Sequence, residues 1–262
     1  MPDVHPLQFP CQLPPDARGI PCGRNYPRFL RAGRDNTYGT APNIPAKNLQ
    51  PGRVLDALSM LEQHAIYSKL IDPSVLDVRE QYPMYDAARI RKYLDDPSKR
   101  IPRSLVPSLD IVVTRQSSSS SSGYTFEAIC VKEFDELGKK EIQRRLIREQ
   151  EFCASLNWSW TLFTRREVVE QRTESARSVC MMARDADLMS LKDHAIKIAP
   201  LMLRKAGKVS LRRLKTLVTK AVEPDQLRAD ELIAAAILFG FVILDLDAPF
   251  NNDSPIQVAA KA

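Results

Sequence analysis

Apolar and polar positions alternate with two different periods in the middle of the chain. Over residues 54–70 the apolar side chains recur at steps of three and four, which predicts one helix with a buried face. Asp72 and Pro73 end this helix, and a period of two then predicts a strand over 75–82. The alternation assigns Asp77, Arg79 and Gln81 to one side of this strand and Leu76, Val78 and Tyr82 to the other.

Two β-branched segments, 109–114 and 124–132, predict the next strands. A run of serines and Gly123 separates them, which suits a hairpin loop between antiparallel neighbours. Helical spacing over 135–156 and a closing strand at 158–164 follow. A strand, a helix and a strand in this order imply a right-handed crossover and a parallel pair. The sequence therefore predicts an α/β fold with a mixed sheet and helices on its faces.

Proline interrupts this pattern before and inside the predicted sheet. Residues 1–46 hold many prolines and several arginines, which predicts an extended basic arm along a phosphate backbone or a partner protein. A solvated tail explains the same composition. Residues 83–107 are charged and proline-rich, and we expect an insertion there with one short helix near 85–94.

The pattern beyond Glu167 changes to helices, expected at 175–187, 191–206, 210–222 and 228–239. They are followed by an apolar strand at 241–246, a turn at 251–254 and a weaker strand at 255–258. Helices that end in a β-hairpin form the outline of a winged-helix domain, and Ser210 is its expected N-cap residue. We therefore expect an arm at 1–46, an α/β domain at 47–172 and a winged-helix-like domain at 173–262.

Composition narrows the class of protein. Of the 262 residues 44% are hydrophobic and 27% are charged, as in ordinary globular proteins. The formal net charge of +6 favours an acidic partner such as nucleic acid, although many basic proteins bind none. The five cysteines are scattered without CxxC pairs, which argues against a structural zinc site. We expect a cytoplasmic protein, since no signal peptide and no apolar run of membrane-spanning length is evident.

The predicted hairpin brings an acid and a base side by side. Asp110 lies near the beginning of one strand and Lys132 at the end of the next, so antiparallel pairing makes them neighbours. Glu62, at the edge of the apolar stripe of the preceding helix, would add a second carboxylate. Carboxylates around a divalent cation, with a lysine beside them, suit phosphodiester hydrolysis. A cross-strand ion pair at a sheet edge, with Glu62 on the surface, explains the same spacing.

Four segments resemble, in order, the motifs of the TnsA endonucleases, which are subunits of heteromeric transposases. They are SMLE at 59–62, DPSVLDVREQYP at 72–83, LDIVVT at 109–114 and EAICVK at 127–132. The most specific part is VLDVREQYP, because a bare pattern of Asp and Lys occurs by chance in most chains. At the level of these motifs, the resemblance covers about residues 35–170.

The resemblance implies a restriction-endonuclease-like core that cleaves the 5′ (non-transferred) strands at transposon ends. By matching position, Glu62 and Asp110 would bind Mg²⁺ or Mn²⁺, and Lys132 would be the catalytic lysine. Where the family commonly has Gln or Glu two residues before this lysine, the chain has Cys130, and a thiol is a poor ligand for Mg²⁺. The backbone carbonyl of Cys130 would then be the ligand at this position.

The resemblance also implies partners. They are DNA, a TnsB-like transposase that cuts and joins the 3′ ends, and a TnsC-like ATPase regulator that the C-terminal domain contacts. Basic side chains on two predicted helices are the expected DNA contacts: Arg144, Arg145, Arg148, Arg212, Arg213 and Lys215. A solvated helix face explains such clusters equally well. A protein of this kind would act at the nucleoid of a bacterial cell.

Two other functions fit the same residues. Cys130 is consistent with a non-catalytic assembly factor that binds DNA and a TnsC-like ATPase on a nuclease scaffold. A stand-alone restriction or repair nuclease would share the fold and would cleave DNA without partners. The sequence leaves these alternatives open.

Overall fold

The computed structural model describes most of the chain. The described residues are 13–26, 43–45, 54–84, 107–117, 123–222 and 228–259. The helix expected near 85–94, nearly all of the serine run and much of the arm at 1–46 lie outside them. Among the described helices, none has the length and apolar character needed to cross a membrane.

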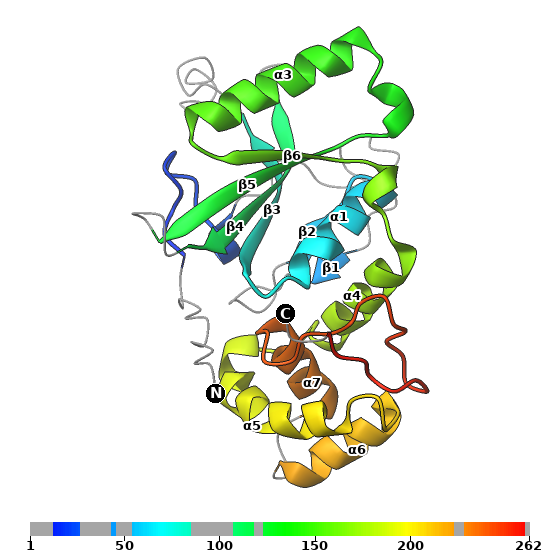
Figure 1. Ribbon diagram of the computed structural model, residues 1–262. Helices are drawn as coiled ribbons and strands as arrows, with labels where there is room; N and C mark the ends of the chain where they lie inside the picture. The colour runs from blue at the N-terminus through cyan, green and yellow to red at the C-terminus, as the bar shows by residue number, and fades with distance from the viewer. Residues whose placement is uncertain are drawn as a thin grey trace.

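A mixed sheet forms the centre of the first part of the molecule (Figure 1). Its described strands are β3 (Val75–Pro83), β4 (Ser108–Gln116), β5 (Tyr124–Val131) and β6 (Ser159–Phe163), in that spatial order. The pairs β3–β4 and β4–β5 are antiparallel, whereas β5 and β6 are parallel. The predicted hairpin, the crossover and the mixed α/β sheet are therefore confirmed.

The first helix begins later than its apolar spacing predicts. Residues 54–56 form strand β2 (Val54–Asp56), which pairs with β1 (Asn43–Pro45), and helix α1 spans Met60–Leu70. The hydroxyl of Ser59 accepts a hydrogen bond from the backbone N–H of Glu62, which fixes the start of α1. A single helix over 54–70 was wrong because Val54, an apolar residue of the short strand β2, happens to continue the helical spacing.

Strand β3 departs from simple alternation at Gln81. All nine residues of β3 are buried, and Gln81 has a φ of 49°, in the left-handed region. Leu76 and Val78 face one apolar cluster, but Tyr82 packs in the cluster on the other face of the sheet, beside Trp158. The prediction that Tyr82 shares a face with Leu76 is therefore wrong, because the backbone turns over at Gln81.

Helices flank the sheet and build the second half of the molecule. After the 3₁₀ turn Phe134–Glu136, helix α3 spans Lys140–Ser155, so the predicted start at residue 135 was too early. The remaining helices are α4 (Glu170–Met182), α5 (Leu188–Lys205), α6 (Leu211–Ala221) and α7 (Ala229–Leu238). Ser210 caps α6 as expected, since its hydroxyl accepts a hydrogen bond from Arg213 N–H. The expected boundary between residues 172 and 173 falls inside α4.

The expected C-terminal β-hairpin is reduced to one antiparallel bridge, Leu244↔Val258, flanked by two backbone hydrogen bonds. Within the described part of the chain, residues 241–259 contain only the isolated antiparallel bridges Leu244↔Val258 and Ser210↔Pro255. The strands predicted at 241–246 and 255–258 were wrong, because too few consecutive residues pair to form a ladder. The helical order of the second half is as predicted, without a regular wing.

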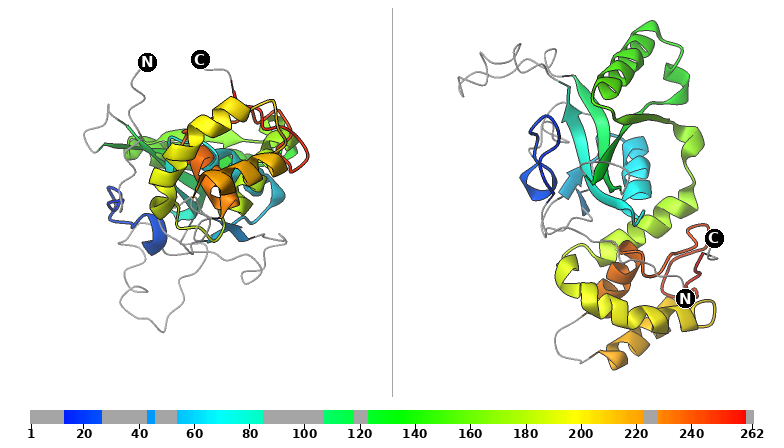
Figure 2. Two further views of the ribbon diagram at one scale, coloured as in Figure 1. Left: turned by 90° about the horizontal axis from the view of Figure 1, so that it is seen from below. Right: turned by 60° about the vertical axis from the view of Figure 1, so that its left-hand side comes forward.

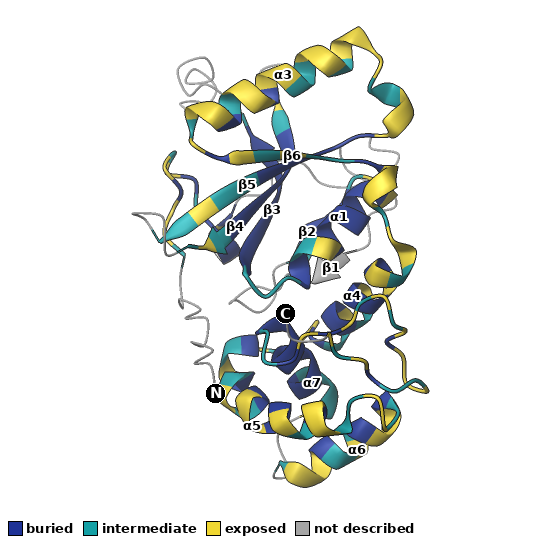
Figure 3. Cartoon of the chain, viewed as in Figure 1, coloured by how far each residue is buried: buried dark blue, intermediate teal, exposed yellow. Residues whose placement is uncertain are grey.

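Two apolar clusters cover the two faces of the sheet (Figure 3). The larger cluster runs without interruption from the sheet through α1 and α4 to α5, α6 and α7. The smaller one holds Tyr82, Trp158 and Cys153 of α3 together with Ile20 and Tyr26. Both halves of the molecule therefore share one continuous core.

Residues 13–26 cover the face of the sheet opposite α1 (Figure 2). The carboxylate of Asp16 accepts hydrogen bonds from Arg79 at 2.6 Å and from the Tyr82 hydroxyl at 2.7 Å. Gly23 N–H donates to Asp77 at 3.0 Å. This part of the expected arm is packed into the domain, because it supplies the counter-charge of the fully buried Arg79.

Candidate functional site

Asp110 is the centre of a buried polar cluster at one end of the sheet. It lies on β4, an internal strand, and its side chain is 6% exposed. Oδ2 accepts hydrogen bonds from Lys132 Nζ and from the backbone N–H of Val131, both at 2.8 Å. Oδ1 accepts a hydrogen bond from Arg145 at 2.9 Å. The carboxylate is thus held in one orientation by the end of β5 and by α3.

Lys132 directly follows β5 and is also buried. Besides its bond to Asp110, Nζ donates to the carbonyl of Val131 at 2.6 Å. Burial is the largest single influence and lowers the pKa of Lys132, but the charge of Asp110, its hydrogen bond and the other raising influences together hold the pKa above its usual value. Lys132 therefore stays a cation and can stabilise negative charge on a bound group.

Glu62 joins the cluster from the first turn of α1. Its side chain is buried and accepts a hydrogen bond from Leu58 N–H at 2.7 Å. Burial, followed by repulsion from Asp110, raises the pKa of Glu62 to about 7, against the opposing influence of Lys132 and Arg145. The mutual influence of these charges shows that Glu62 shares the electrostatic environment of Asp110.

Of the three residues predicted from the sequence, Asp110 and Lys132 are thus in direct contact, whereas Glu62 bonds to Leu58 N–H and interacts with Asp110 through its charge. The ion pair between Asp110 and Lys132 exists, as the simpler interpretation also required. The simpler interpretation was wrong in its other two statements. Glu62 is buried rather than on the surface, and β4 and β5 are internal strands rather than strands at a sheet edge. Glu62 also belongs to the helix cap, so the string Ser59-Met60-Leu61-Glu62 has a structural role in addition to any chemical one.

Cys130 lies on β5 with a fully buried side chain. Burial, then the nearby charges of Asp110 and Glu149, raise the pKa of its thiol far above the usual range. The thiol therefore stays neutral, and a neutral thiol is unsuited to binding Mg²⁺. The carbonyl that contacts Lys132 beside Asp110 is that of Val131, so no described contact assigns a ligand role to the carbonyl of Cys130.

A third carboxylate, Glu149, was missed from the sequence. It lies on α3 with its side chain 1% exposed, and its Oε1 accepts a hydrogen bond from Arg145 at 2.6 Å. Its Oε2 lacks a regular hydrogen-bond partner among the described residues, but the buried Cys130 thiol lies beside the Glu149 carboxylate and interacts with it as a weak donor. The sequence does carry a signal that Glu149 is buried. It lies three residues from Leu146 and three from Phe152, and thus within the apolar stripe of the helix.

Arg145 connects the two acidic side chains. One guanidinium bonds to Asp110 Oδ1 and Glu149 Oε1, and it also donates to the carbonyl of Ser108 at 3.2 Å. Its side chain is 36% exposed, whereas both carboxylates are buried. Arg145 therefore stands between the buried acids and the solvent.

The other expected DNA contacts lie on the surface, and two of them form ion pairs with nearby carboxylates. Arg144 and Arg148 are exposed on α3, and Arg213 is exposed on α6. Arg212 pairs with Asp253 at 2.9 Å, and Lys215 with Asp230 at 3.0 Å. Part of the predicted basic surface of α6 is therefore neutralised by nearby carboxylates.

The chemistry of the cluster fits a hard divalent cation, although no ready-made ligand set is present. Within the described residues, no group of three His, Cys, Asp or Glu side chains is gathered as a metal site. Asp110 and Glu149 instead bind the cations Lys132 and Arg145. Carboxylate oxygens are the ligands that Mg²⁺ and Mn²⁺ prefer, and Oε2 of Glu149, which lacks a regular hydrogen-bond partner among the described residues, leaves one such oxygen open.

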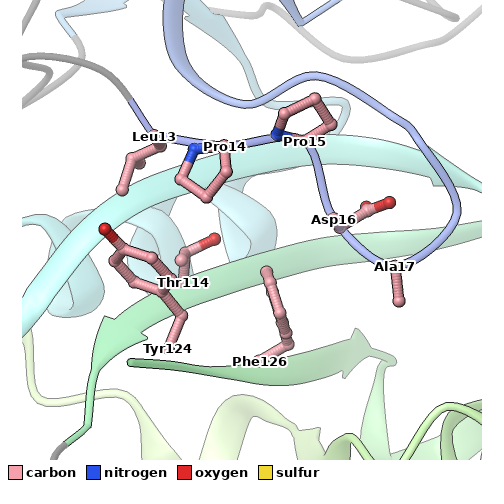
Figure 4. Close-up of a pocket in the computed structure, with 8 residues that line it drawn as sticks. All are labelled: Leu13, Pro14, Pro15, Asp16, Ala17, Thr114, Tyr124 and Phe126. Carbon is pink, nitrogen blue, oxygen red and sulfur yellow. The ribbon is translucent and has the colours of Figure 1, made fainter. Parts of the chain in front are cut away.

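A cavity of about 300 Å³ lies elsewhere, between residues 13–17 and the far ends of β4 and β5 (Figure 4). Pro14 and Pro15 face Thr114, Tyr124 and Phe126 across it. Asp110, Lys132 and the other members of the buried cluster do not line it, so the chemistry of the cluster is separate from this cavity.

The chain was also compared with known proteins. No protein-family model matches it, and no curated protein matches it. The function is therefore inferred from the sequence motifs and from the geometry of the cluster.

Proposed function

We propose that the chain is a Mg²⁺- or Mn²⁺-dependent DNA endonuclease that cleaves the 5′ strands at transposon ends. In this proposal the sheet and its helices are a restriction-endonuclease-like core, and the C-terminal helices are a winged-helix-like domain without a regular wing. The resemblance of four sequence segments to the TnsA endonucleases supports the choice of substrate.

One observation carries the proposal. Asp110 from β4 and Lys132 from the end of β5 form a buried ion pair, and the charge of Asp110 influences the buried Glu62 of α1, although up to 70 residues separate these groups in the sequence. Burying several charged groups together costs stability unless each is paired, so such clusters are concentrated at functional sites. An acid, a second acid with a raised pKa and a protonated lysine are the groups that phosphodiester hydrolysis needs.

Each residue then has a definite task. Asp110, Glu62 and Glu149 would hold the cation, which supplies charge neutralisation at the phosphate and a water of lowered pKa. Lys132, kept protonated by Asp110, would donate hydrogen bonds to the attacked phosphate or to the water. The backbone N–H of Val131 keeps the Asp110 carboxylate oriented throughout.

The proposed partners are DNA, a TnsB-like transposase and a TnsC-like ATPase, met at the bacterial nucleoid. The exposed arginines Arg144, Arg148 and Arg213 support contacts with the phosphate backbone. The paired residues Arg212 and Lys215 would contribute less, since Asp253 and Asp230 already neutralise them. The carbonyl of Cys130 has no place in the proposed ligand set.

Asp110→Asn tests the proposal. The amide keeps the shape of the side chain but loses the charge that holds a divalent cation, so nicking that depends on Mg²⁺ should fall by more than about 100-fold while DNA binding persists. A strand-specific cleavage assay with the transposase and ATPase of the same element measures this. The matched control is Asp247→Asn, which removes an exposed carboxylate paired with Arg172 and should cleave normally.

The outcomes separate the alternatives. Nicking unchanged in Asp110→Asn rules out the proposed site. Cleavage by the chain alone, without partners, favours a stand-alone nuclease. A non-catalytic assembly factor is the second candidate, because both oxygens of Asp110 already bond to cationic side chains. It predicts no nicking with any partner and no Mn²⁺ binding that depends on Asp110.

A further inference from the structure

The guanidinium of Arg145 lies beside Asp110, where a metal-dependent enzyme would hold its metal ion. The guanidinium of Arg145 bonds to Asp110 Oδ1 at 2.9 Å and to Glu149 Oε1 at 2.6 Å, and so bridges two buried carboxylates from different elements. A cation that bridges two carboxylates in this way occupies the place that a divalent ion would take between the same oxygens.

We propose that Arg145 is an exchangeable occupant of this cation position: a divalent ion displaces its guanidinium, which then binds a phosphate of the DNA. This inference rests on the proposed nuclease function and deepens it. It assigns to one residue both the stabilisation of the metal-free cluster and the recruitment of the substrate.

The burial of the groups supports an exchange. Asp110 and Glu149 are 6% and 1% exposed, so neither carboxylate can remain unpaired at low cost. Arg145 is 36% exposed and reaches them from α3, so its side chain can swing outward without opening the core. The guanidinium of Arg145 also donates a hydrogen bond to the backbone carbonyl of Ser108 at 3.2 Å, and the exchange would break this third bond.

The neighbours of the bridge also favour replacement by an ion of higher charge. Glu149 Oε2 lacks a regular hydrogen-bond partner among the described residues, and Glu62 carries a carboxylate into the same region. A guanidinium satisfies one oxygen of Asp110 and one of Glu149, whereas a divalent ion with several oxygen ligands can serve more of these groups. The displaced arginine then has a planar face of donors suited to a phosphate.

The first measurement is Mn²⁺ binding without DNA, by calorimetry, for the wild type, Arg145→Gln and Arg148→Gln. We expect Arg145→Gln to bind Mn²⁺ about tenfold more tightly than the wild type, because the ion no longer competes with two charge-assisted hydrogen bonds. Arg148→Gln, an exposed arginine on the same helix, should bind Mn²⁺ as the wild type does.

The second measurement is the salt dependence of binding to a DNA duplex, with Ca²⁺ in place of the catalytic ion and without any divalent ion. Each phosphate contact adds about 1 to the slope of log affinity against log salt. With Ca²⁺, the slope of Arg145→Gln should be smaller than that of the wild type by about 1. Without a divalent ion, the two slopes should be equal. A residue that only supports the fold would not show this dependence on the ion.

The results distinguish two failures. Equal Mn²⁺ affinity of wild type and Arg145→Gln, with binding still lost in Asp110→Asn, overturns the exchange but leaves the proposed nuclease site. Binding of Mn²⁺ that persists in the double variant Asp110→Asn/Arg145→Gln overturns the nuclease site itself. A slope that falls equally with and without Ca²⁺ also overturns the exchange, since Arg145 would then contact DNA regardless of the ion.

Discussion

At the residue scale, Glu62 is a carboxylic acid whose ionisation the fold opposes. Its pKa rises from 4.5 to about 7, first because the side chain is buried and then because Asp110 is close. Between these two values the folded chain binds a proton that the unfolded chain has released. The stability of the wild type should therefore decrease as the pH rises through this interval.

Glu62→Gln tests this relation in metal-free buffer. Glutamine resembles the protonated acid and can still accept the hydrogen bond from Leu58, so its stability should lack this pH dependence. A shift of this size corresponds to about 3 kcal/mol between pH 4.5 and 8. Urea unfolding of both proteins at several pH values measures the difference. Parallel pH profiles would show that Glu62 ionises as freely in the folded chain as in the unfolded one.

The sequence was informative for residues whose position follows from strand pairing. Asp110 and Lys132 had to meet once an antiparallel hairpin joined their strands. Glu149 and the bridging role of Arg145 were not predictable in this way, because they depend on how α3 lies against the sheet. Spacing along a helix shows which residues share a face, but it does not show which strand that face meets.

At the scale of the elements, residues 13–26 act as a clamp on β3. Asp16 provides the carboxylate at 2.6 Å from Arg79, whose side chain is fully buried among the rings of Tyr26, Tyr82 and Phe126. A buried arginine that loses its partner is left as an uncompensated charge. The proline-rich segment is therefore expected to stabilise the sheet as well as cover it.

Asp16→Ala should destabilise the protein by about 3 kcal/mol or more, because Arg79 loses its closest counter-charge and Tyr82 loses its acceptor. Denaturant unfolding gives this free energy directly. Asp253→Ala is the control, because it removes an exposed carboxylate paired with Arg212, and it should cost less than about 1 kcal/mol. Similar losses in both variants would mean that the buried pair contributes no more than a surface pair.

Local sequence patterns are not sufficient to predict where each helix and strand begins. The start of α1 at Met60 is fixed by the Ser59 cap, yet the apolar spacing continues back through β2 and predicts no break there. Residues 13–26 look like an arm in the sequence because prolines prevent a regular period. Their place in the core depends on contacts with distant residues, such as the ion pair of Asp16 with Arg79 and the bond of Gly23 to Asp77, and no periodicity reports such contacts.

At the scale of the whole molecule, one apolar cluster joins the sheet to the C-terminal helices. The α/β order of the first half was predictable because each strand has its own period and turn signals. The winged outline of the second half was only partly correct, since residues 241–259 pack irregularly against the helices instead of forming a regular hairpin. A continuous core predicts that both halves unfold together, provided that the contact between them is close.

Gly240 lies at that contact, and substituting it tests the coupling. The residue has a φ of +78°, and an added Cβ would lie 2.7 Å from Pro73 Cβ, in the turn between α1 and β3. Gly240→Ala should therefore lower the melting temperature by about 10 °C, from backbone strain together with the clash. Gly123 has a φ of +75°, but a Cβ added there would have no neighbour within 4 Å, so strain alone should lower the melting temperature of Gly123→Ala by about 3 °C. Gly138→Ala should leave the melting temperature unchanged. Calorimetry should show one transition for all four proteins. If Gly240→Ala melts like Gly123→Ala, or if the two halves melt separately, the close packing of Gly240 on Pro73 does not hold the halves together.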